Sequence, residues 1–206
     1  MNKAIIFDMD GVLIDARDWH YEALNMALEV FGLEIPYEDH LEKFNGLSTR
    51  QKLNIITDLY ALPTELHTII SSTKQDRTLR IAAEKCYPIT QHLILFELLK
   101  SKGYKIGVYT NSIRQTAEAM LAYAGLLEKI DVLVTNQDVK SPKPNPEGYL
   151  LACEQLIVQA SDTYVVEDGE YGIQAAESAG CKVIRVSSPM DVSISLVATH
   201  LPEILL

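Results

Sequence analysis

The feature that most constrains the fold is a series of short apolar segments, the later of which alternate with helical patterns. The segments are rich in Val, Ile and aromatic residues without strict alternation, which is typical of strands covered on both faces. They are Ala4–Phe7, Lys105–Tyr109, Val132–Val134, Tyr164–Val166 and Val183–Val186, and the helical patterns are Ile113–Ala124, Glu147–Gln159 and Ile173–Ala179. Gly125 and Gly180 lie where helices commonly end. The alternation predicts an α/β fold with a doubly wound parallel sheet.

The first two strands are separated by about a hundred residues, far more than a normal crossover needs. This interval has its own helical patterns at Trp19–Phe31, Glu38–Phe44, Thr49–Tyr60, Glu65–Glu84 and Gln91–Lys102. We assign the last of these to the sheet domain, as the crossover into the second strand. The others predict a helical cap domain, residues 16–84, inserted into a core domain of residues 1–15 and 85–206.

Charge and composition exclude several classes of partner. The net charge of −10 argues against a nucleic-acid or anionic-membrane surface, both of which need clustered Lys and Arg. No apolar run reaches the roughly 18 residues of a membrane span, and the N-terminal apolar run is too short for a signal peptide. The three cysteines are scattered, as buried thiols in a reducing compartment are. We expect a cytoplasmic protein, and a monomer.

Polar side chains follow the predicted strands at the sheet edge where open α/β proteins bind ligands. Taken singly, each has an ordinary alternative role as a turn former, a helix cap or a solvated surface lysine. Together they would place four carboxylates close to one another, and such a cluster is tolerable only with cations present. A magnesium ion and a lysine would supply that charge. The residues are Asp8 and Asp10, Thr110, Asn111 and Ser112, Lys143, and Glu167 and Asp168.

These residue types support phosphoryl transfer. A carboxylate such as Asp8 can attack phosphorus and form an aspartyl-phosphate, which divides one difficult displacement into two. Asp10 points the same way from an extended strand end, so it can reach the leaving and the incoming oxygens as acid and base. Thr110 and nearby backbone N–H groups can donate to the phosphoryl oxygens, and Lys143 can neutralise their charge.

Four segments together resemble the motifs of the haloacid dehalogenase-like hydrolase superfamily, in the order that the family has them. They are Asp-Met-Asp-Gly-Val-Leu-Ile-Asp at 8–15, Val-Tyr-Thr-Asn-Ser at 108–112, Ser-Pro-Lys-Pro-Asn-Pro at 141–146, and Val-Val-Glu-Asp-Gly-Glu-Tyr-Gly-Ile-Gln-Ala-Ala at 165–176. The position of the insert is similar to that of members with a helical C1 cap, such as β-phosphoglucomutase and phosphoglycolate phosphatase. The resemblance implies a Rossmann-like core and a Mg²⁺ cofactor.

The resemblance also implies a role for each motif residue. Asp8 would be the nucleophile and Asp10 the acid/base, with the Asp10 backbone carbonyl as a metal ligand. Asp168 would bind the metal directly, and Glu167 would act at or just beyond the metal shell. Thr110, Asn111 (through its N–H) and Lys143 would bind the phosphoryl group. Dehalogenases lack an acid at the second position, so Asp10 argues against dehalogenation.

The cap residues carry a weaker signal about the substrate. His20 matches a histidine of β-phosphoglucomutase, with a packing role as the even alternative. The loop Asn45-Gly46-Leu47-Ser48-Thr49-Arg50 resembles a cap loop that enters the active site, which makes Ser48 and Arg50 candidate contacts, although Arg50 is displaced by one position from the arginine of the mutase. Lys74 is a further candidate contact, with surface solvation as the favoured alternative. Ala16 replaces the usual hinge Thr or Ser.

We therefore expect a Mg²⁺-dependent phosphatase that acts on a small phosphorylated metabolite, a sugar phosphate in the first instance. A mutase similar to β-phosphoglucomutase is the nearest alternative. A phospho-accepting receiver domain also pairs acidic residues with a Thr and a Lys, but it has no large helical insert. A catalytically inactive binding relative is the remaining alternative, and the presence of all four motifs argues against it.

Overall fold

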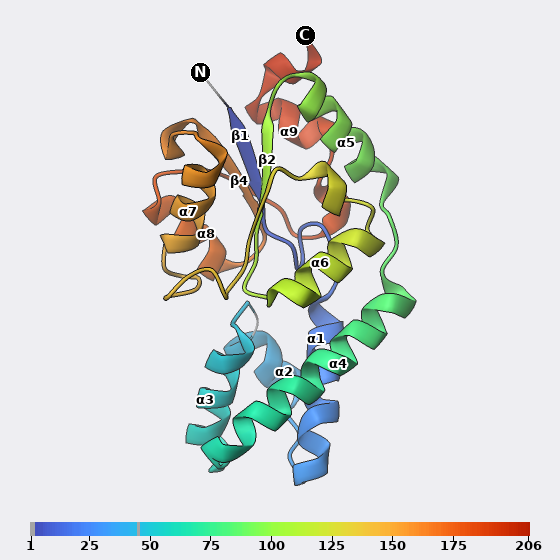
Figure 1. Ribbon diagram of the computed structural model, residues 1–206, viewed down its shortest axis with the longest axis vertical. Coiled ribbons are helices and arrows are strands. Elements are labelled where there is room, and N and C mark those ends of the chain that lie inside the picture. The colour runs from blue at the N-terminus through green and yellow to red at the C-terminus, as the bar shows by residue number, and fades with distance from the viewer. Residues whose placement is uncertain (1–2, 45) are drawn as a thin grey trace.

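A five-stranded parallel sheet forms the centre of the core domain (Figure 1). The computed structural model describes residues 3–44 and 46–206. The strands lie in the order β3-β2-β1-β4-β5. Their bounds are Ala4–Phe7 for β1, Lys105–Tyr109 for β2, Val132–Val134 for β3, Thr163–Glu167 for β4 and Lys182–Arg185 for β5. The central strand β1 pairs with β2 on one side and β4 on the other. The predicted α/β fold is confirmed.

Helices cover both faces of the sheet, which is why the charged residues of its strands stand only at strand ends. In β1, Ile5 and Phe7 face one apolar cluster, whereas Ala4 and Ile6 face the other. The first cluster takes in α5, α6 and α9, and the second takes in α7 and α8. Their bounds are Thr90–Ser101 for α5, Arg114–Tyr123 for α6, Glu147–Leu156 for α7, Glu170–Ser178 for α8 and Ile194–His200 for α9. The helices pack on opposite sides of the sheet (Figure 1).

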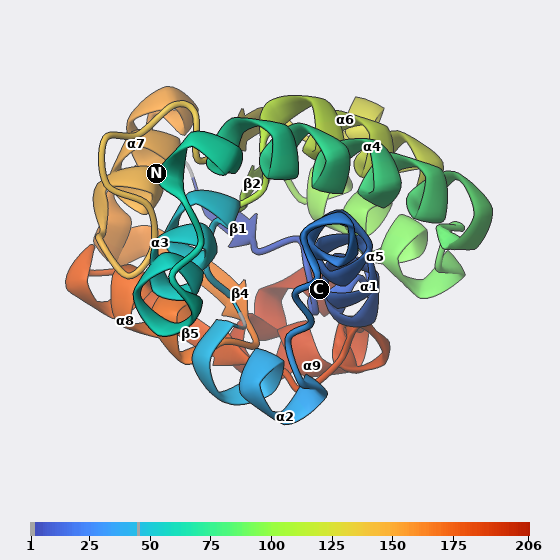
Figure 2. The ribbon, with the colours of Figure 1, turned by 90° about the horizontal axis from the view of Figure 1, so that it is seen from below.

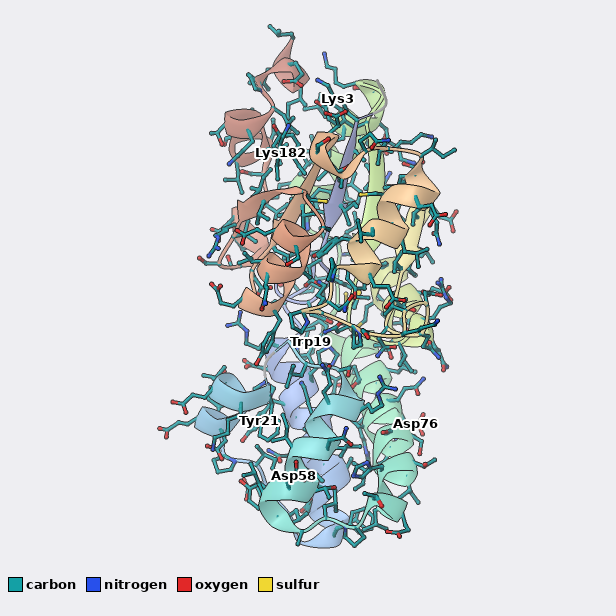
Figure 3. All side chains as sticks on the ribbon, turned by 90° about the vertical axis from the view of Figure 1, so that its left-hand side faces the viewer. Lys3, Trp19, Tyr21, Asp58, Asp76 and Lys182 are labelled. Carbon is teal, nitrogen blue, oxygen red and sulfur yellow. The ribbon has the colours of Figure 1, made fainter. Side chains whose placement is uncertain are left out.

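Four helices between β1 and α5 form what we call the cap, which lies beyond the carboxyl ends of the strands (Figure 1). They are α1 (Arg17–Leu28), α2 (Tyr37–Asp39), α3 (Thr49–Tyr60) and α4 (His67–Lys85). Viewed from the cap side, α4 crosses the upper part of the picture, α3 and α2 lie to the left and below, and α1 is seen nearly end-on (Figure 2). A separate apolar cluster that includes Leu24, Phe44 and Ile56 holds them together. Trp19, at the junction, packs against the core (Figure 3).

The helices differ from the sequence-based expectation mainly at their ends. The segment predicted as one helix at 38–44 is the short α2 followed by a π-helical turn, His40–Phe44. Helix α7 ends at Leu156 instead of reaching Gln159, because Ile157 adopts a left-handed conformation with φ of 58°. Gly125 and Gly180 follow helix ends with positive φ, as predicted.

Helix α9 was not predicted. It is a seven-residue helix that starts from the N-cap Ser193 and is followed by Pro202, and its burial of Val197 against the core is a tertiary effect. Short 3₁₀ turns complete the chain at Glu29–Phe31, Thr64–Leu66, Leu127–Lys129, Ala160–Asp162, Pro189–Asp191 and Pro202–Leu205. Among the described residues, none of the helices has both the length and the hydrophobicity needed to span a bilayer.

Candidate active site

Three neighbouring strands end at the edge of the sheet that faces the cap. Asp8 follows β1, Thr110 follows β2, and Glu167 is the last residue of β4. Because these strands are parallel and adjacent, their carboxyl ends meet at one edge. A cavity of about 680 Å³ is lined by residues of this edge, such as Asp8 and Asp10, and by residues of the cap. The topology therefore brings together motifs that lie far apart in the sequence.

Lys143 lies on the core side of this cavity, and acidic and aromatic side chains surround its ammonium group. Its ammonium group donates to Asp8 Oδ1, and it donates to Glu167 Oε1 at 2.5 Å. The nitrogen also lies 4.9 Å from the ring centre of Tyr109 and 5.2 Å from that of Tyr149. Burial would lower the pKa of Lys143, but the charges of Asp8 and Glu167 outweigh it and raise the pKa well above its ordinary value. Lys143 is a fixed positive charge beside Asp8.

Glu167 holds that lysine and its own loop in place. Its Oε1 accepts from Lys143 and from the Tyr149 hydroxyl at 2.9 Å. Its Oε2 accepts from the backbone N–H groups of Asp168 and Gly169 at 3.0 and 3.1 Å. Both carboxylate oxygens are therefore occupied within the protein. This buried glutamate belongs to the acidic cluster, and its contacts are those of a residue that positions others.

The acidic cluster fits a divalent cation. Asp8, Glu167 and Asp168 each offer a carboxylate oxygen, and these oxygens lie within 4.8 Å of one another. Burial raises the pKa of Asp8, Lys143 opposes this effect, and the neighbouring carboxylates Glu167 and Asp168 reinforce it. Burial and Glu167 likewise raise the pKa of Asp168, against the opposing charge of Arg17, whose guanidinium lies 3.1 Å from it. A lysine and a peripheral arginine thus leave negative charge uncompensated, and oxygen donors of this kind suit a hard cation.

The loop after β1 approaches Asp168 closely at Gly11. A Cβ atom at this position would lie 2.2 Å from Asp168 Oδ2, and the φ of Gly11 is +92°. Glycine is therefore required there both by the space and by the backbone conformation. This contact sets the separation between the Asp8–Asp10 segment and Asp168.

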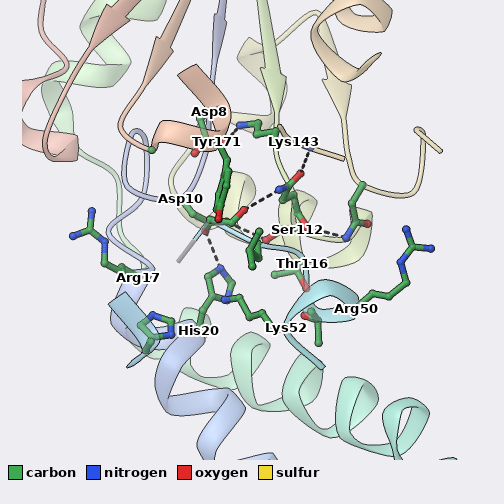
Figure 4. A pocket seen from close by; sticks show the side chains of 18 of the residues that line it. Asp8, Asp10, Arg17, His20, Arg50, Lys52, Ser112, Thr116, Lys143 and Tyr171 are labelled. Carbon is green, nitrogen blue, oxygen red and sulfur yellow. Dashed lines mark hydrogen bonds and ion pairs between the residues drawn. The ribbon is translucent and has the colours of Figure 1, made fainter. Parts of the chain in front are cut away.

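Asp10 points toward the cap, where His20 meets it. Its Oδ2 accepts from the Ser112 hydroxyl at 3.0 Å, and its Oδ1 lies 3.0 Å from His20 Nε2 (Figure 4). The other ring nitrogen of His20, Nδ1, lies 3.0 Å from Lys74 Nζ. Burial raises the pKa of Asp10, but the His20 and Ser112 contacts outweigh it and lower the pKa below its ordinary value. Lys74, for which solvation was the favoured alternative, instead joins a chain of polar contacts that ends on Asp10.

The segment after β2 is held by its own side chains. The Thr110 hydroxyl accepts from the Ser112 backbone N–H at 3.0 Å, and Thr110 is buried and does not line the cavity. The Asn111 side chain connects two loops: its Nδ2 donates to the Gly46 carbonyl of the cap at 2.8 Å, and its Oδ1 accepts from the Lys143 N–H at 3.2 Å. Asn111 thus ties the cap loop to the lysine loop.

Two of the proposed cap contacts do not point at the carboxylates of Asp8 and Asp10. Ser48 does not line the cavity, because its side chain caps α3 in a reciprocal arrangement with Gln51. Arg50 is exposed at the rim and points away from Asp8 and Asp10 (Figure 4). Asn45, from the same predicted loop, lies outside the described residues. Neither Ser48 nor Arg50 therefore approaches the carboxylates in this arrangement.

The sequence analysis missed several cavity residues, among them His40 and Lys52. Both are almost completely buried. The signal was present in the pattern, because Lys52 falls beside Leu53 and four residues before Ile56 on the apolar face of α3. His40 likewise precedes the buried Phe44 by one helical turn. A charged or polar residue among the apolar positions of a helix means one of two things: the buried face has been assigned to the wrong residues, or the residue belongs to an internal polar site.

Comparison with known proteins agrees with this geometry. The model of the haloacid dehalogenase-like hydrolase family matches residues 5–186. A phosphorylated carbohydrates phosphatase of Thermotoga maritima is 32% identical over 88% of this chain and 83% of its own length. The fructose-1-phosphate phosphatase YqaB of Escherichia coli is 31% identical over 88% of this chain and 95% of its own.

A solved structure of similar shape is the β-phosphoglucomutase of Clostridium difficile. It superimposes with a TM-score of 0.85 over 100% of this chain and 99% of its own, at 24% identity. At that level of identity the likeness concerns the fold, including the position of the cap.

Proposed function

We propose that this chain, which belongs to the haloacid dehalogenase-like hydrolase family, removes the phosphoryl group of a small carbohydrate phosphate through an aspartyl-phosphate on Asp8. It is a phosphoric monoester hydrolase, the class of its named relatives. The observation that carries the mechanism is the position of Asp8. This carboxylate opens into the cavity with Lys143 bound to one of its oxygens and Asp10 two residues away.

In the first step, an Asp8 oxygen attacks phosphorus, and the bond from phosphorus to the leaving oxygen breaks. Lys143 stabilises the negative charge that gathers on the phosphoryl oxygens, because it is buried, charged and fixed by Glu167. Asp10 delivers a proton to the leaving oxygen. Ser112 and His20 hold the Asp10 carboxyl group in position for this transfer.

In the second step, water attacks the phosphorus atom of the aspartyl-phosphate, and the bond to Asp8 breaks. Asp10 now removes a proton from the water. Asp10 is ionised at this stage because it gave its proton to the leaving oxygen in the first step. The backbone N–H of Asn111 lies in the loop after β2 and would donate to a phosphoryl oxygen. Thr110 shapes this loop by accepting from the Ser112 N–H, which leaves its own hydroxyl proton for another acceptor, and we propose that this proton is donated to a phosphoryl oxygen.

Asp8 and Asp168, with the backbone carbonyl of Asp10, would hold the Mg²⁺ ion that we propose as the cofactor. When bound, this ion would supply positive charge between the carboxylates and the phosphoryl group. We propose that Glu167 acts beyond the metal ligands, since both of its oxygens are already bonded.

The substrate class rests on the relatives, two of which are named for carbohydrate phosphates. We also propose that the enzyme works as a monomer in the cytoplasm. The free thiols of Cys86, Cys153 and Cys181 support a reducing compartment.

Phosphate release from a panel of sugar phosphates, with and without Mg²⁺, tests the proposal. Asp8→Asn removes the nucleophile and should abolish release from every substrate. Asp15→Asn is the matched control, because Asp15 is exposed and does not line the cavity. Turnover retained in Asp8→Asn would refute the aspartyl-phosphate mechanism.

A mutase is distinguished from a phosphatase by the fate of β-glucose 1-phosphate. A phosphatase releases inorganic phosphate and glucose. If the main product is glucose 6-phosphate, the phosphoryl group has returned to a sugar hydroxyl and hydrolysis is not the function.

A further inference from the structure

The cap side of the cavity carries a group of buried basic residues. His20, His40, Lys52 and Lys74 all line the cavity, and each comes from the cap. His20 Nδ1 lies 3.0 Å from Lys74 Nζ, and His20 Nε2 lies 3.0 Å from Asp10 Oδ1, so each of these two side chains has a polar neighbour. Among the described residues, the side chains of Lys52 and His40 make no hydrogen bond or ion pair.

Lys52 is a buried ammonium group that lacks an anionic partner. It projects from the apolar face of α3 and is 5% exposed. Within residues 3–44 and 46–206, no carboxylate lies within ion-pair distance of its nitrogen. Figure 4 shows it on the cap side of the cavity, close to His20. Burial and the charge of Lys74 lower the pKa of Lys52 to about 7, which expresses the cost of holding this charge without compensation.

The carboxylate of Asp10 does not meet this need. Asp10 is the group whose negative charge favours the ammonium form of Lys52. However, one Asp10 oxygen accepts from Ser112, and the other faces His20. Both Asp10 oxygens are therefore engaged by other groups, and Lys52 remains available to another anion.

His40 provides a second, independent observation. It is 1% exposed, and neither of its ring nitrogens has a hydrogen-bond partner among the described residues. Its ring packs against those of Tyr21 and Tyr37, which fix its orientation. His40 and Lys52 line the same cavity. A buried imidazole with two unused nitrogens indicates a polar ligand, because leaving such groups unpaired is costly.

We propose that Lys52 and His40 form a binding site for a second anionic group of the substrate, remote from the phosphoryl group that is transferred. The substrate is then a small phosphate monoester that also carries a carboxylate or a second phosphoryl group. This inference rests on the proposed function and narrows it. Lys143 serves the transferred group at the core side, and Lys52 serves the remote anion at the cap side.

Matched substrate pairs test the inference. The carboxylate arm compares 3-phosphoglycerate with glycerol 3-phosphate, and the phosphoryl arm compares fructose 1,6-bisphosphate with fructose 1-phosphate. In each pair the first compound carries a second anionic group, and the second compound has a neutral hydroxyl-bearing group at the same position. We expect kcat/KM to favour the anionic member by about 10- to 100-fold in at least one arm, as one charge-assisted hydrogen bond would produce. The arm that shows the preference identifies the anion.

Variants connect that preference to the two residues. Lys52→Met should bring the kcat/KM ratio of the preferred pair close to one, and Lys52→Arg should restore most of it. His40→Phe, which keeps an aromatic ring between Tyr21 and Tyr37, should reduce the ratio independently. Lys85→Met is the control, because Lys85 is an exposed lysine of α4 outside the cavity and should leave the ratio unchanged.

The outcomes separate this inference from the proposed function. Turnover without a preference in either arm, or a preference that survives both Lys52→Met and His40→Phe, would overturn the second-anion site and leave the phosphatase intact. Absence of turnover with every substrate would refute the proposed function instead. Calorimetric binding of the same four compounds to Asp8→Asn, with and without Lys52→Met, then decides the site: a preference that Lys52→Met removes supports it, and equal binding overturns it.

Discussion

At the residue scale, the position of Lys143 depends on Glu167, and the position of Glu167 depends on Gly172. The Glu167 carboxylate fits against the start of α8 because Gly172 has no side chain. A Cβ atom at Gly172 would lie 1.6 Å from Glu167 Oε1, the oxygen that accepts from both Lys143 and Tyr149. Packing therefore requires that the second glycine of the pattern Glu-Asp-Gly-Glu-Tyr-Gly, Gly172, has no side chain.

We therefore predict that Gly172→Ala displaces Glu167 and with it Lys143. The kcat/KM for phosphate release should fall by about 100-fold, the order expected when a catalytic group moves by about 1 Å. Gly169→Ala is the matched control, since a Cβ there would meet only Glu167 Oε2 at 3.9 Å and φ is −102°. Steady-state kinetics of the two variants gives the answer, and equal effects would contradict the packing argument.

At the element scale, the start of α3 is stabilised by Ser48. The Gln51 N–H donates to Ser48 Oγ at 3.4 Å, while the Ser48 N–H donates to Gln51 Oε1 at 2.9 Å. This capping box satisfies two backbone donors at the helix start. It also explains why a residue that the sequence suggested as a substrate contact is turned toward its own helix.

Ser48→Ala should lower the free energy of unfolding by about 1 kcal/mol, because it removes the cap. Ser48→Asp should retain most of the stability, since Asp is also a good N-cap. Denaturant unfolding followed by circular dichroism measures both. An Ala variant as stable as the parent would show that the capping box contributes nothing.

The turn that follows α2 should make stability depend on pH through His40. Burial, reinforced by the charge of Lys52, lowers the pKa of His40 to about 4. The unfolded chain binds the proton at its ordinary pKa of about 6.5, whereas the folded chain resists it. Stability is therefore lost as the pH falls from about 6.5 toward 4, by at most about 3 kcal/mol.

The comparison of the parent with His40→Phe isolates this contribution. Phe cannot bind a proton, so the difference in free energy of unfolding between the two proteins should change in favour of Phe as the pH falls through that interval. All other titrating groups are common to both proteins. If the difference in free energy of unfolding is constant between pH 7 and 4, His40 binds a proton as readily in the folded chain as in the unfolded chain, and the prediction is wrong.

At the scale of the whole molecule, the acidic cluster joins segments from both ends of the core domain. Asp8 follows β1 and Asp168 follows β4, and their charges repel within a buried site. A cation that binds only the folded arrangement stabilises it by mass action.

Mg²⁺ at a hundredfold excess over its dissociation constant should accordingly raise the unfolding temperature by about 5 to 10 °C relative to the protein in chelator. Asp168→Asn should lose this rise. Asp15→Asn, which changes an exposed carboxylate outside the cavity, should keep it. Differential scanning calorimetry provides the measurement, and a full rise in Asp168→Asn would exclude Asp168 as a ligand.

The sequence by itself determined the sheet, its covered faces and the edge at which the motif residues meet. These follow from local periodicity and from the rule that parallel strands place their carboxyl ends together. Asp8, Lys143 and Glu167 could be assigned to one place because Asp8 follows β1, Glu167 ends β4 and Lys143 lies in the loop that follows β3. Their position depends on topology more than on the packing of any one side chain.

Tertiary structure alone decided the chemistry of the cap. Whether Lys74 meets solvent or His20, whether Arg50 points into the cavity or away from it, and whether Lys52 is buried all depend on how helices rotate and pack against one another. Helical periodicity identifies which residues share a face, but the direction of that face is set by contacts with distant segments. Helix α9 was missed for the same reason, since the burial of Val197 against the core, and not its seven-residue pattern, stabilises it.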